Sequence, residues 1–217
     1  MKTVQIAIDG PAGAGKSTIA KRIAESFNYV YIDTGAMYRA ITLKAMRLNL
    51  DLDDPDGFGF IDSTDFAYHE GKLIMDGEDV SDRIRSRDIS NNVSLVSSYL
   101  SVRKKTVKRQ QEIAQNINVV MDGRDIGTNV LVNAQYKFFL TASVQTRARR
   151  RYKENLERGI MSTLEDLQRE IEMRDQFDST REHSPLKAAS DAIVIDTSNM
   201  SIDEVVTIIK RKVREDE

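Results

Sequence analysis

The stretch that most constrains the fold is IAIDGPAGAGKSTIAKRIAE, residues 6–25, in which a short apolar run leads into a loop with three glycines. Residues 10–17 of this stretch, GPAGAGKS, match the P-loop pattern G-x-x-x-x-G-K-[ST]. The apolar run predicts a strand, and residues 16–27 carry apolar side chains at helical spacing. Glycines let backbone N–H groups approach a phosphate, and the helix N-terminus adds its dipole. The stretch therefore predicts a nucleoside triphosphate site between a strand and a helix.

The polar residues of the loop have distinct expected tasks. Lys16 is expected to reach the β- and γ-phosphates, and the Ser17 hydroxyl is expected to coordinate Mg²⁺. The residues expected to bind the triphosphate are Gly10, Pro11, Ala12, Gly13, Ala14, Gly15, Lys16, Ser17 and Thr18. A glycine turn without function is the alternative, and the flanking strand and helix argue against it. The loop alone does not distinguish kinases from motors and switches, since all of them use it.

The pattern of apolar runs predicts an α/β fold of the P-loop NTPase type. Strands are expected at 3–8, 30–33, 117–123, 136–142 and 192–198, and helices at 16–27, 35–50, 93–115, 144–159, 163–181 and 201–213. This alternation favours a single domain, 1–217, with a central parallel sheet of about five strands flanked by helices. Residues 65–80 break the rhythm with three short strands, which predicts a small antiparallel insert. Ser201 and Glu204 have the spacing of a capping box at the start of the last helix.

The composition excludes several classes of protein. The formal net charge of −2 gives no overall field that would attract nucleic acid or a membrane. The absence of cysteine excludes disulfides, a cysteine nucleophile and zinc bound by thiolates. No segment approaches the roughly 20 apolar residues that span a bilayer, and the N-terminus lacks the features of a signal peptide. We therefore expect a soluble, cytoplasmic monomer that binds neither nucleic acid nor membrane.

A second acidic group is needed if a metal ion accompanies the triphosphate. Asp122 ends the apolar run NVVM, at the edge of the sheet where parallel strands bind ligands. It is therefore expected to hold Mg²⁺ through water, together with Ser17. An Asp-Gly turn that only ends a strand is the alternative.

Two rows of arginines lie on predicted helices. Arg174 and Arg181 share one helix face with Asp178. Arg147, Arg150 and Arg151 share a face of another helix. A solvated helix face is the alternative for each row. We favour phosphate binding, because a guanidinium group offers a rigid fork of donors and a permanent charge to phosphoryl oxygens.

Four motifs together resemble those of one enzyme family. They are GPAGAGKST, DTGAMYRA, DGRDIGT and RDQFDSTR, the last with SPL close behind. In this combination the chain resembles the bacterial cytidylate kinases, the CMP and dCMP kinase branch of the nucleoside monophosphate kinases, from about residue 6 to residue 206. The resemblance implies transfer of the γ-phosphoryl group of ATP to CMP or dCMP with Mg²⁺. It also implies that residues 57–95 form an enlarged monophosphate-binding insert.

One group of residues binds the acceptor nucleotide in such kinases, and the resemblance implies the same here. The acceptor set is Thr34, Tyr38, Arg39, Ser94, Arg103, Asp122, Arg124, Asp125 and Asp178. Arg39 and Arg124 would contact the acceptor phosphate, and Asp178 would bind its sugar. The set Ser94, Arg103 and Asp125 would read the cytosine edge, where a carboxylate accepts from the amino group while Arg and Ser donate to N3 and O2. Uracil has a carbonyl at the amino position and would be disfavoured.

A second group would act on the phosphoryl group in transfer. Its implied members are Lys16, Arg124, Arg147, Arg151, Arg174 and Arg181. Within it, Arg174 and Arg181 would clamp both phosphate chains. Arg147 and Arg151 would belong to a short helical lid, 147–163, that closes over ATP and excludes water. The loop DTSNMS, which follows the last strand, would border the adenine.

Two alternatives to this function remain open at the level of sequence. The first is a kinase of the same class that acts on UMP, AMP or shikimate. The second is a nucleotide-dependent switch, which would need loops ordered by the γ-phosphate and a partner surface. The chain has no guanine-specificity motif such as N-K-x-D, and it carries arginines for what look like two phosphate groups. These features favour a kinase.

Overall fold

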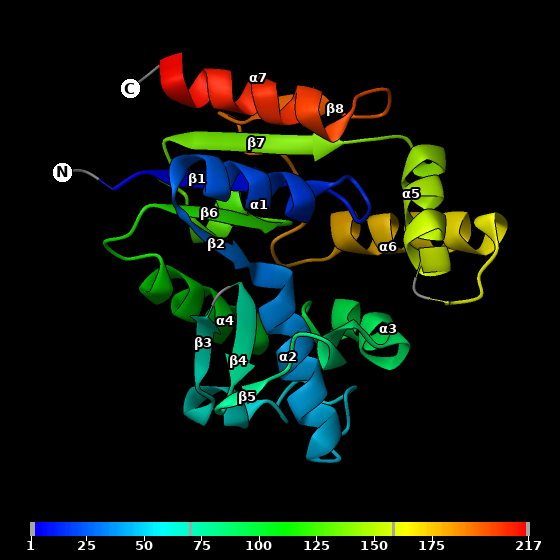
Figure 1. Ribbon diagram of the computed structural model, residues 1–217. Coiled ribbons are helices and arrows are strands. Elements are labelled where there is room, and N and C mark those ends of the chain that lie inside the picture. The colour runs from blue at the N-terminus through cyan, green and yellow to red at the C-terminus, as the bar shows by residue number, and fades with distance from the viewer. Residues whose placement is uncertain (1–2, 70, 158, 216–217) are drawn as a thin grey trace.

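The computed structural model of the protein describes residues 3–69, 71–157 and 159–215. Its centre is a parallel sheet of five strands in the order β2–β6–β1–β7–β8, as predicted (Figure 1). The strands are β1 (Gln5–Asp9), β2 (Val30–Asp33), β6 (Val119–Gly123), β7 (Tyr136–Thr141) and β8 (Ile193–Asp196). Because all five run the same way, the loops that follow them meet at one edge of the sheet.

Helices cover both faces of this sheet (Figure 1). On one face, α1 (Lys16–Phe27) and α7 (Ile202–Glu215) form a buried cluster with Ile6 and Ile8 of β1. On the other face, Ala7 points into a cluster with α4 (Leu100–Ile113) and the helical turn η3 (Ile126–Val130). The alternation of Ile6, Ala7 and Ile8 therefore sends neighbouring side chains into two cores, as a sheet buried on both faces requires.

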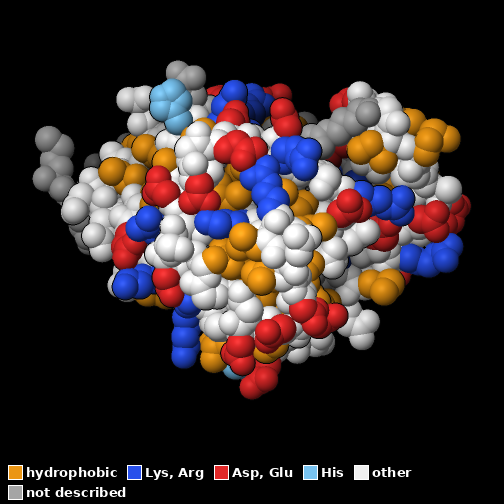
Figure 2. Space-filling view, turned by 90° about the horizontal axis from the view of Figure 1, so that it is seen from below, with side chains coloured by type: hydrophobic (Ala, Val, Ile, Leu, Met, Phe, Trp, Pro, Cys, Tyr) orange, Lys and Arg blue, Asp and Glu red, His pale blue; other side chains and the backbone are white. Residues whose placement is uncertain are grey.

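The antiparallel insert lies at one end of the molecule (Figure 1). It consists of β3 (Phe66–His69), β4 (Lys72–Met75) and β5 (Glu78–Asp79), with the short turns η1 (Gly59–Ser63) and η2 (Arg83–Arg85). Its apolar side chains share a core with α2 (Thr34–Arg47) and α3 (Arg87–Val96). Figure 2, seen from this end, shows basic and acidic side chains interspersed on the surface, with small apolar patches between them. The insert is thus fastened to the helix that follows β2.

One predicted helix is wrong. Residues 93–115 do not form a single helix, because α3 ends at Val96 and α4 begins at Leu100. The hydroxyls of Ser97 and Ser98 donate to the carbonyls of Ser94 and Leu95, at 3.1 and 2.7 Å. Such side chains satisfy the last carbonyls of a helix and compete with its continuation. The break turns the chain so that α4 runs back under the sheet.

Two further helices, α5 (Val144–Glu157) and α6 (Leu164–Thr180), follow β7 in the chain and form a pair of their own. They pack together through Ala148, Leu167 and Ile171. Ser201 and Glu204 form the predicted capping box, since each side chain accepts from the other's backbone N–H. Glu70, in the predicted hairpin turn, and Arg158, in the predicted lid, lie outside the described residues. Among the described residues, no helix is both long enough and apolar enough to cross a membrane.

Candidate active site

The glycine loop follows β1 and joins it to α1. Gly10 has φ 146°, and a Cβ there would lie 2.0 Å from the carbonyl oxygen of Leu140. Gly13 and Gly15 have φ 76° and 87°, in the left-handed region that favours glycine. The glycines therefore serve the close approach and the positive φ values that the sequence predicts. The helix α1 begins directly after the loop, and its N-cap residue Gly15 offers no side-chain acceptor to the first amides of the helix, which suits an anion site.

Lys16 is buried at the start of α1. Its Nζ donates to the carbonyl oxygen of Pro11 at 2.7 Å, across the loop. Burial, and then the nearby charge of Arg124, lower the pKa of Lys16 to about 7. A buried cation with one carbonyl partner gains most from an anion beside it. The geometry therefore suits Lys16 to phosphate oxygens held in the loop.

Ser17 and Asp122 meet beside the loop, as predicted. The Ser17 hydroxyl donates to Asp122 Oδ2 at 2.8 Å, and the Tyr31 hydroxyl donates to Asp122 Oδ1 at 2.7 Å. Thr34 donates its hydroxyl to the Asp122 carbonyl at 2.7 Å. Burial, and then the charge of Asp33, raise the pKa of Asp122 to about 6. The result is a cluster of oxygen atoms that a hard cation would stabilise.

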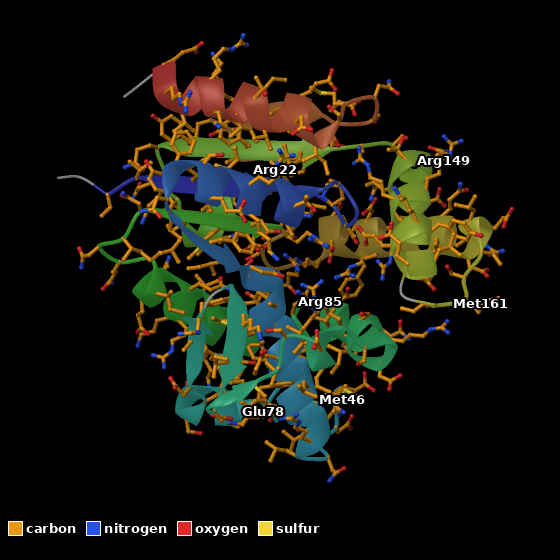
Figure 3. The ribbon with its side chains drawn as sticks, viewed as in Figure 1. Arg22, Met46, Glu78, Arg85, Arg149 and Met161 are labelled. Carbon is orange, nitrogen blue, oxygen red and sulfur yellow. The ribbon has the colours of Figure 1, made fainter. Side chains whose placement is uncertain are left out.

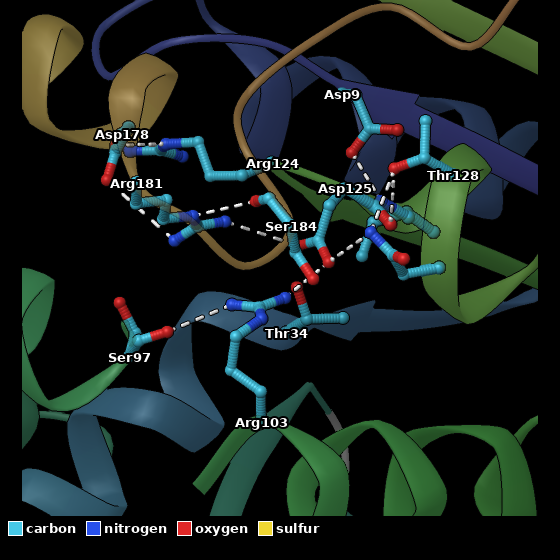
Figure 4. Close-up of polar contacts among 12 residues, drawn as sticks. Asp9, Thr34, Ser97, Arg103, Arg124, Asp125, Thr128, Asp178, Arg181 and Ser184 are labelled. Carbon is cyan, nitrogen blue, oxygen red and sulfur yellow. Dashed lines mark hydrogen bonds and ion pairs between the residues drawn. The ribbon is translucent and has the colours of Figure 1, made fainter. Parts of the chain in front are cut away.

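A second hollow lies next to the loop, between the end of β6 and the helices α2, α3, α4 and α6. We call it the arginine cavity. It is lined by Thr34, Gly35, Tyr38, Arg39, Val93, Ser97, Arg103, Gly123, Arg124, Asp125, Arg174, Asp178 and Arg181. Five arginines from four segments thus converge on one small space, with only two carboxylates among them. Figure 4 shows part of this set, with Arg103, Arg124, Asp125, Asp178 and Arg181 turned toward one another.

Several buried polar atoms in the arginine cavity make no hydrogen bond to any residue that the structure describes. They are the Tyr38 hydroxyl, Arg39 Nε, Arg103 Nε, Arg174 Nε and Arg181 Nη2. Two of these nitrogens lie at ion-pair distance from a carboxylate, Arg174 Nε at 3.9 Å from Asp178 and Arg181 Nη2 at 3.8 Å from Asp125. Buried donors are almost always hydrogen-bonded in folded proteins, and leaving one unmade costs about 1–3 kcal/mol. The cavity is therefore built for a ligand that supplies several acceptor oxygens.

The electrostatics of the arginine cavity point to the same conclusion. Burial, and then Arg124, lower the pKa of Arg174 to about 9. Burial, and then Arg103, lower the pKa of Arg181. Burial alone would raise the pKa of Asp178, but Arg124 and Arg174 hold it below the ordinary value. The neighbouring cations repel one another, so an anion such as phosphate bound among them would stabilise their charged forms.

One end of the cavity has the chemistry of a base-reading site. Arg103 donates from Nη2 to Asp125 Oδ2 and from Nη1 to the Ser97 carbonyl, the latter at 3.0 Å. The Arg103 guanidinium also lies over the Tyr38 ring, 5.4 Å from its centroid. Asn129 donates to Asp125 Oδ2 at 3.1 Å. Ser94, predicted to join Arg103 and Asp125, is half-buried on α3 and is not among the lining residues, whereas Ser97 is.

The arginines of α5 have three different surroundings. Arg147 is buried, forms a bidentate ion pair with Asp175 at 3.0 and 2.5 Å, and donates to the Ala12 carbonyl of the loop at 3.1 Å. Arg151 is close enough to lower the pKa of Arg174. Arg150 donates to the Thr197 carbonyl at 2.7 Å.

Two side chains mark the outer side of this helix pair. Figure 3 shows Arg149 on the outer side of α5 and Met161 in the loop after it. Both are exposed. The inward and outward faces of α5 therefore differ, and the inward face carries the arginines that contact the loop or the cavity side.

A groove on the other side of the loop has a different character. It is lined by Gly13, Ala14, Gly15, Thr18, Ile19, Arg150, Lys153, Glu154, Glu157, Thr197, Met200, Ser201, Ile202 and Val205. Three of these, Thr197, Met200 and Ser201, belong to the segment DTSNMS that follows β8. The glycine loop thus lies between a partly apolar groove and the arginine cavity. This arrangement suits a base and its phosphates on one side and a second anion on the other.

Sequence reasoning missed several residues that shape the site. Asp33 accepts from Arg39 at 2.8 Å and caps α2 by accepting from the Ala36 N–H. Tyr31 fixes Asp122, and Asp175 fixes Arg147. Asp33 is the first residue of the motif DTGAMYRA and directly precedes a predicted helix, so its capping role could have been predicted from the sequence. The contacts of Tyr31 and Asp175 join distant segments and left no local signal.

Comparison with known proteins gives a consistent result. A family model described as cytidylate kinase matches residues 6–215. The cytidylate kinase of Ligilactobacillus salivarius is 52% identical over 221 residues, covering 99% of this chain and 98% of that one. The cytidylate kinase of Bacillus cytotoxicus is 49% identical over 219 residues, with 99% and 97% coverage. Among solved structures, a shikimate kinase from Bacteroides thetaiotaomicron matches with a TM-score of 0.50 at 15% identity, covering 97% of this chain and 98% of that one, which shows a shared fold.

Proposed function

Because the chain belongs to the cytidylate kinase family and transfers the γ-phosphoryl group of ATP to CMP or dCMP, we propose that its two neighbouring hollows carry that reaction. The glycine loop holds ATP, and the arginine cavity holds the acceptor. The observation that carries this assignment is the convergence of five arginines, two of which lower the pKa of Lys16. Four of the five have a buried nitrogen that makes no hydrogen bond to any described residue. An acceptor phosphate supplies the oxygens that these nitrogens lack.

On the donor side, the amides of residues 10–18 and the Lys16 ammonium bind the triphosphate. Ser17 and Asp122 would hold Mg²⁺, since a hydroxyl and a carboxylate beside a phosphate site are the oxygen ligands that this ion prefers. When bound, Mg²⁺ neutralises charge that develops on the phosphate oxygens. The base of ATP lies in the groove beside Thr197 and Met200.

On the acceptor side, Arg39 and Arg124 bind the phosphate of CMP, and Thr34 and Tyr38 lie beside them. Asp178, which already accepts from Arg124 Nε at 2.9 Å, binds the sugar. Arg103 and Asp125 read the cytosine edge, with Asp125 accepting from the amino group. Ser94 remains a predicted member of this set. Because it does not line the cavity, its contact with cytosine would require a shift of α3 or rotation of the Ser94 hydroxyl.

The chemistry needs no protein nucleophile. An oxygen of the CMP phosphate attacks the γ-phosphorus of ATP, the bond to the bridging oxygen breaks, and ADP leaves with the electron pair. The groups Arg174, Arg181 and Lys16 neutralise the charge on the phosphoryl oxygens during transfer. Residues 147–163 act as a lid that excludes water, with Arg147 and Arg151 on its inner side. Residues 57–95 form the acceptor-binding insert, and the enzyme works as a cytoplasmic monomer.

The experiment is an assay of ADP formation with CMP, dCMP, UMP and AMP as acceptors. Multiple turnovers that depend on CMP or dCMP support the proposed site. A kinase for another acceptor would prefer UMP or AMP. A switch would release ADP slowly and at the same rate without any acceptor.

A further inference from the structure

Asp9 is the last residue of β1 and stands directly before the glycine loop. Its side chain is buried, with 3% of the residue exposed. Oδ1 accepts from the Ile126 N–H at 2.7 Å, and Oδ2 accepts from the Gly127 N–H at 2.8 Å. One carboxylate therefore holds two consecutive amides of a segment more than 100 residues away in the sequence. Figure 4 shows Asp9 close to Asp125 and Thr128, which flank these two amides.

The two amides open the helical turn η3, which follows Arg124 and Asp125 without a gap. Both of those residues line the arginine cavity. The turn is also pressed against the sheet, because a Cβ on Gly127 would lie 3.2 Å from Lys137 Cδ and 3.4 Å from Asp9 Oδ2. A small shift of the turn would therefore move the side chains of Arg124 and Asp125.

The carboxylate is specifically suited to this contact. Two adjacent N–H groups need two acceptor atoms, and an ionised carboxylate offers them on one carbon. An amide in its place would offer one acceptor and would turn a donor toward the second N–H. The position is costly for a charge, since burial raises the pKa of Asp9 to about 6 despite both hydrogen bonds. The neighbouring charges that act on it are Asp125 and Lys16.

We propose that Asp9 is a positioning residue for recognition of the acceptor nucleotide. It does not line the arginine cavity, so it acts through Arg124 and Asp125, whose backbone it fixes to the strand that carries the glycine loop. The inference rests on the proposed function of that cavity. The Asp9 side chain thus fixes the position of the segment that binds the acceptor relative to the loop that binds ATP.

The test compares Asp9→Asn with the wild type in the assay of ADP formation. The kcat/KM for CMP is expected to fall about tenfold or more, because one buried N–H loses its acceptor and the segment shifts. The preference for CMP over UMP is expected to fall by a similar factor, while KM for ATP stays within about twofold. The matched control is Ile6→Val, which removes a buried methylene from the same strand without touching η3.

Three results would overturn the inference. In the first, Asp9→Asn lowers thermal stability as Ile6→Val does and leaves the CMP preference unchanged. In the second, it raises KM for ATP and CMP equally. If the variant does not fold, amide exchange in the wild type decides, since the Ile126 and Gly127 amides should exchange as slowly as those of β6, and fast exchange contradicts the proposal. If the proposed function itself is wrong, the wild type shows no CMP-dependent turnover. That result is distinct from the three outcomes above, which concern Asp9 alone.

Discussion

Arg174→Met is expected to slow phosphoryl transfer about 10³-fold and to make the free protein more stable. The guanidinium of Arg174 is largely buried beside Arg124, and its pKa is lowered to about 9. Its Nε makes no hydrogen bond to any described residue and lies 3.9 Å from Asp178 Oδ2. A lowered pKa in the folded protein means that the charged form is disfavoured there, and this cost is present at every pH below about 9. Methionine keeps an unbranched apolar stem and removes the charge.

The size of the effect follows from the pKa. A fall from the ordinary value of 12.5 to about 9 corresponds, at 1.36 kcal/mol per pKa unit, to an upper bound of about 5 kcal/mol. A quarter of the side chain is exposed, so water screens part of this cost and we expect a gain of about 1–2 kcal/mol. In a domain of this size that gain raises the melting temperature by about 3–6 °C. The loss of a cation from the transferring phosphoryl group should lower kcat about 10³-fold.

The assay pairs thermal unfolding at pH 7 with turnover of CMP. Arg169→Met serves as the control, because Arg169 lies on the same helix with 73% of its side chain exposed and should change neither quantity appreciably. Addition of ADP and CMP should raise the melting temperature of the wild type more than that of Arg174→Met. If the variant is less stable than the wild type and retains its kcat, the buried charge of Arg174 neither opposes folding nor acts in phosphoryl transfer.

Three further predictions follow from the site. Asp125→Asn should reduce the kcat/KM preference for CMP over UMP about ten- to hundredfold, because an amide no longer offers only acceptors to the cytosine amino group, and an unchanged ratio would remove Asp125 from base recognition. Binding of ATP at pH 8 should take up close to one proton, because Lys16 has a pKa of about 7 when free and phosphate restores its charged form. Calorimetry in two buffers of different ionisation enthalpy measures this uptake, and Lys16→Met should lose it. Asp122→Asn should raise the Mg²⁺ concentration for half-maximal activity about tenfold, whereas the exposed Glu165→Gln should leave it in place.

Local sequence signals predicted most of the fold. Residues 16–27 and 30–33 form a helix and a strand with the predicted bounds, because periodicity and the glycine loop delimit them. The insert was recognisable from two turn signals, and Gly71 and Gly77 indeed have positive φ. The helix break after Val96 was not recognised, since neither proline nor glycine marks it and serine hydroxyls make it.

The residues of the site that stand in motifs at the ends of strands could be predicted from the sequence. Motifs such as DTGAMYR and DGRD place polar residues at strand ends, so their convergence follows from the parallel sheet. The partners of those residues come from other segments, as Asp175 does for Arg147 and Asp9 for η3. Such pairs depend on how α5 packs on α6 and how η3 packs on β1, which periodicity does not encode. The sequence therefore indicates the groups that contact phosphate better than the groups that hold them.

In the proposed mechanism an acceptor phosphate occupies the arginine cavity beside the glycine loop. The decisive measurement is a crystal structure with CMP, ADP, Mg²⁺ and aluminium fluoride, which mimics the phosphoryl group in transfer. We expect the phosphate of CMP within hydrogen-bond distance of Arg39 and Arg124, and the fluoride between Lys16, Arg174 and Arg181. If CMP binds outside this cavity, or if Arg39 Nε, Arg174 Nε and Arg181 Nη2 still find no acceptor in that complex, the assignment of the acceptor site is wrong.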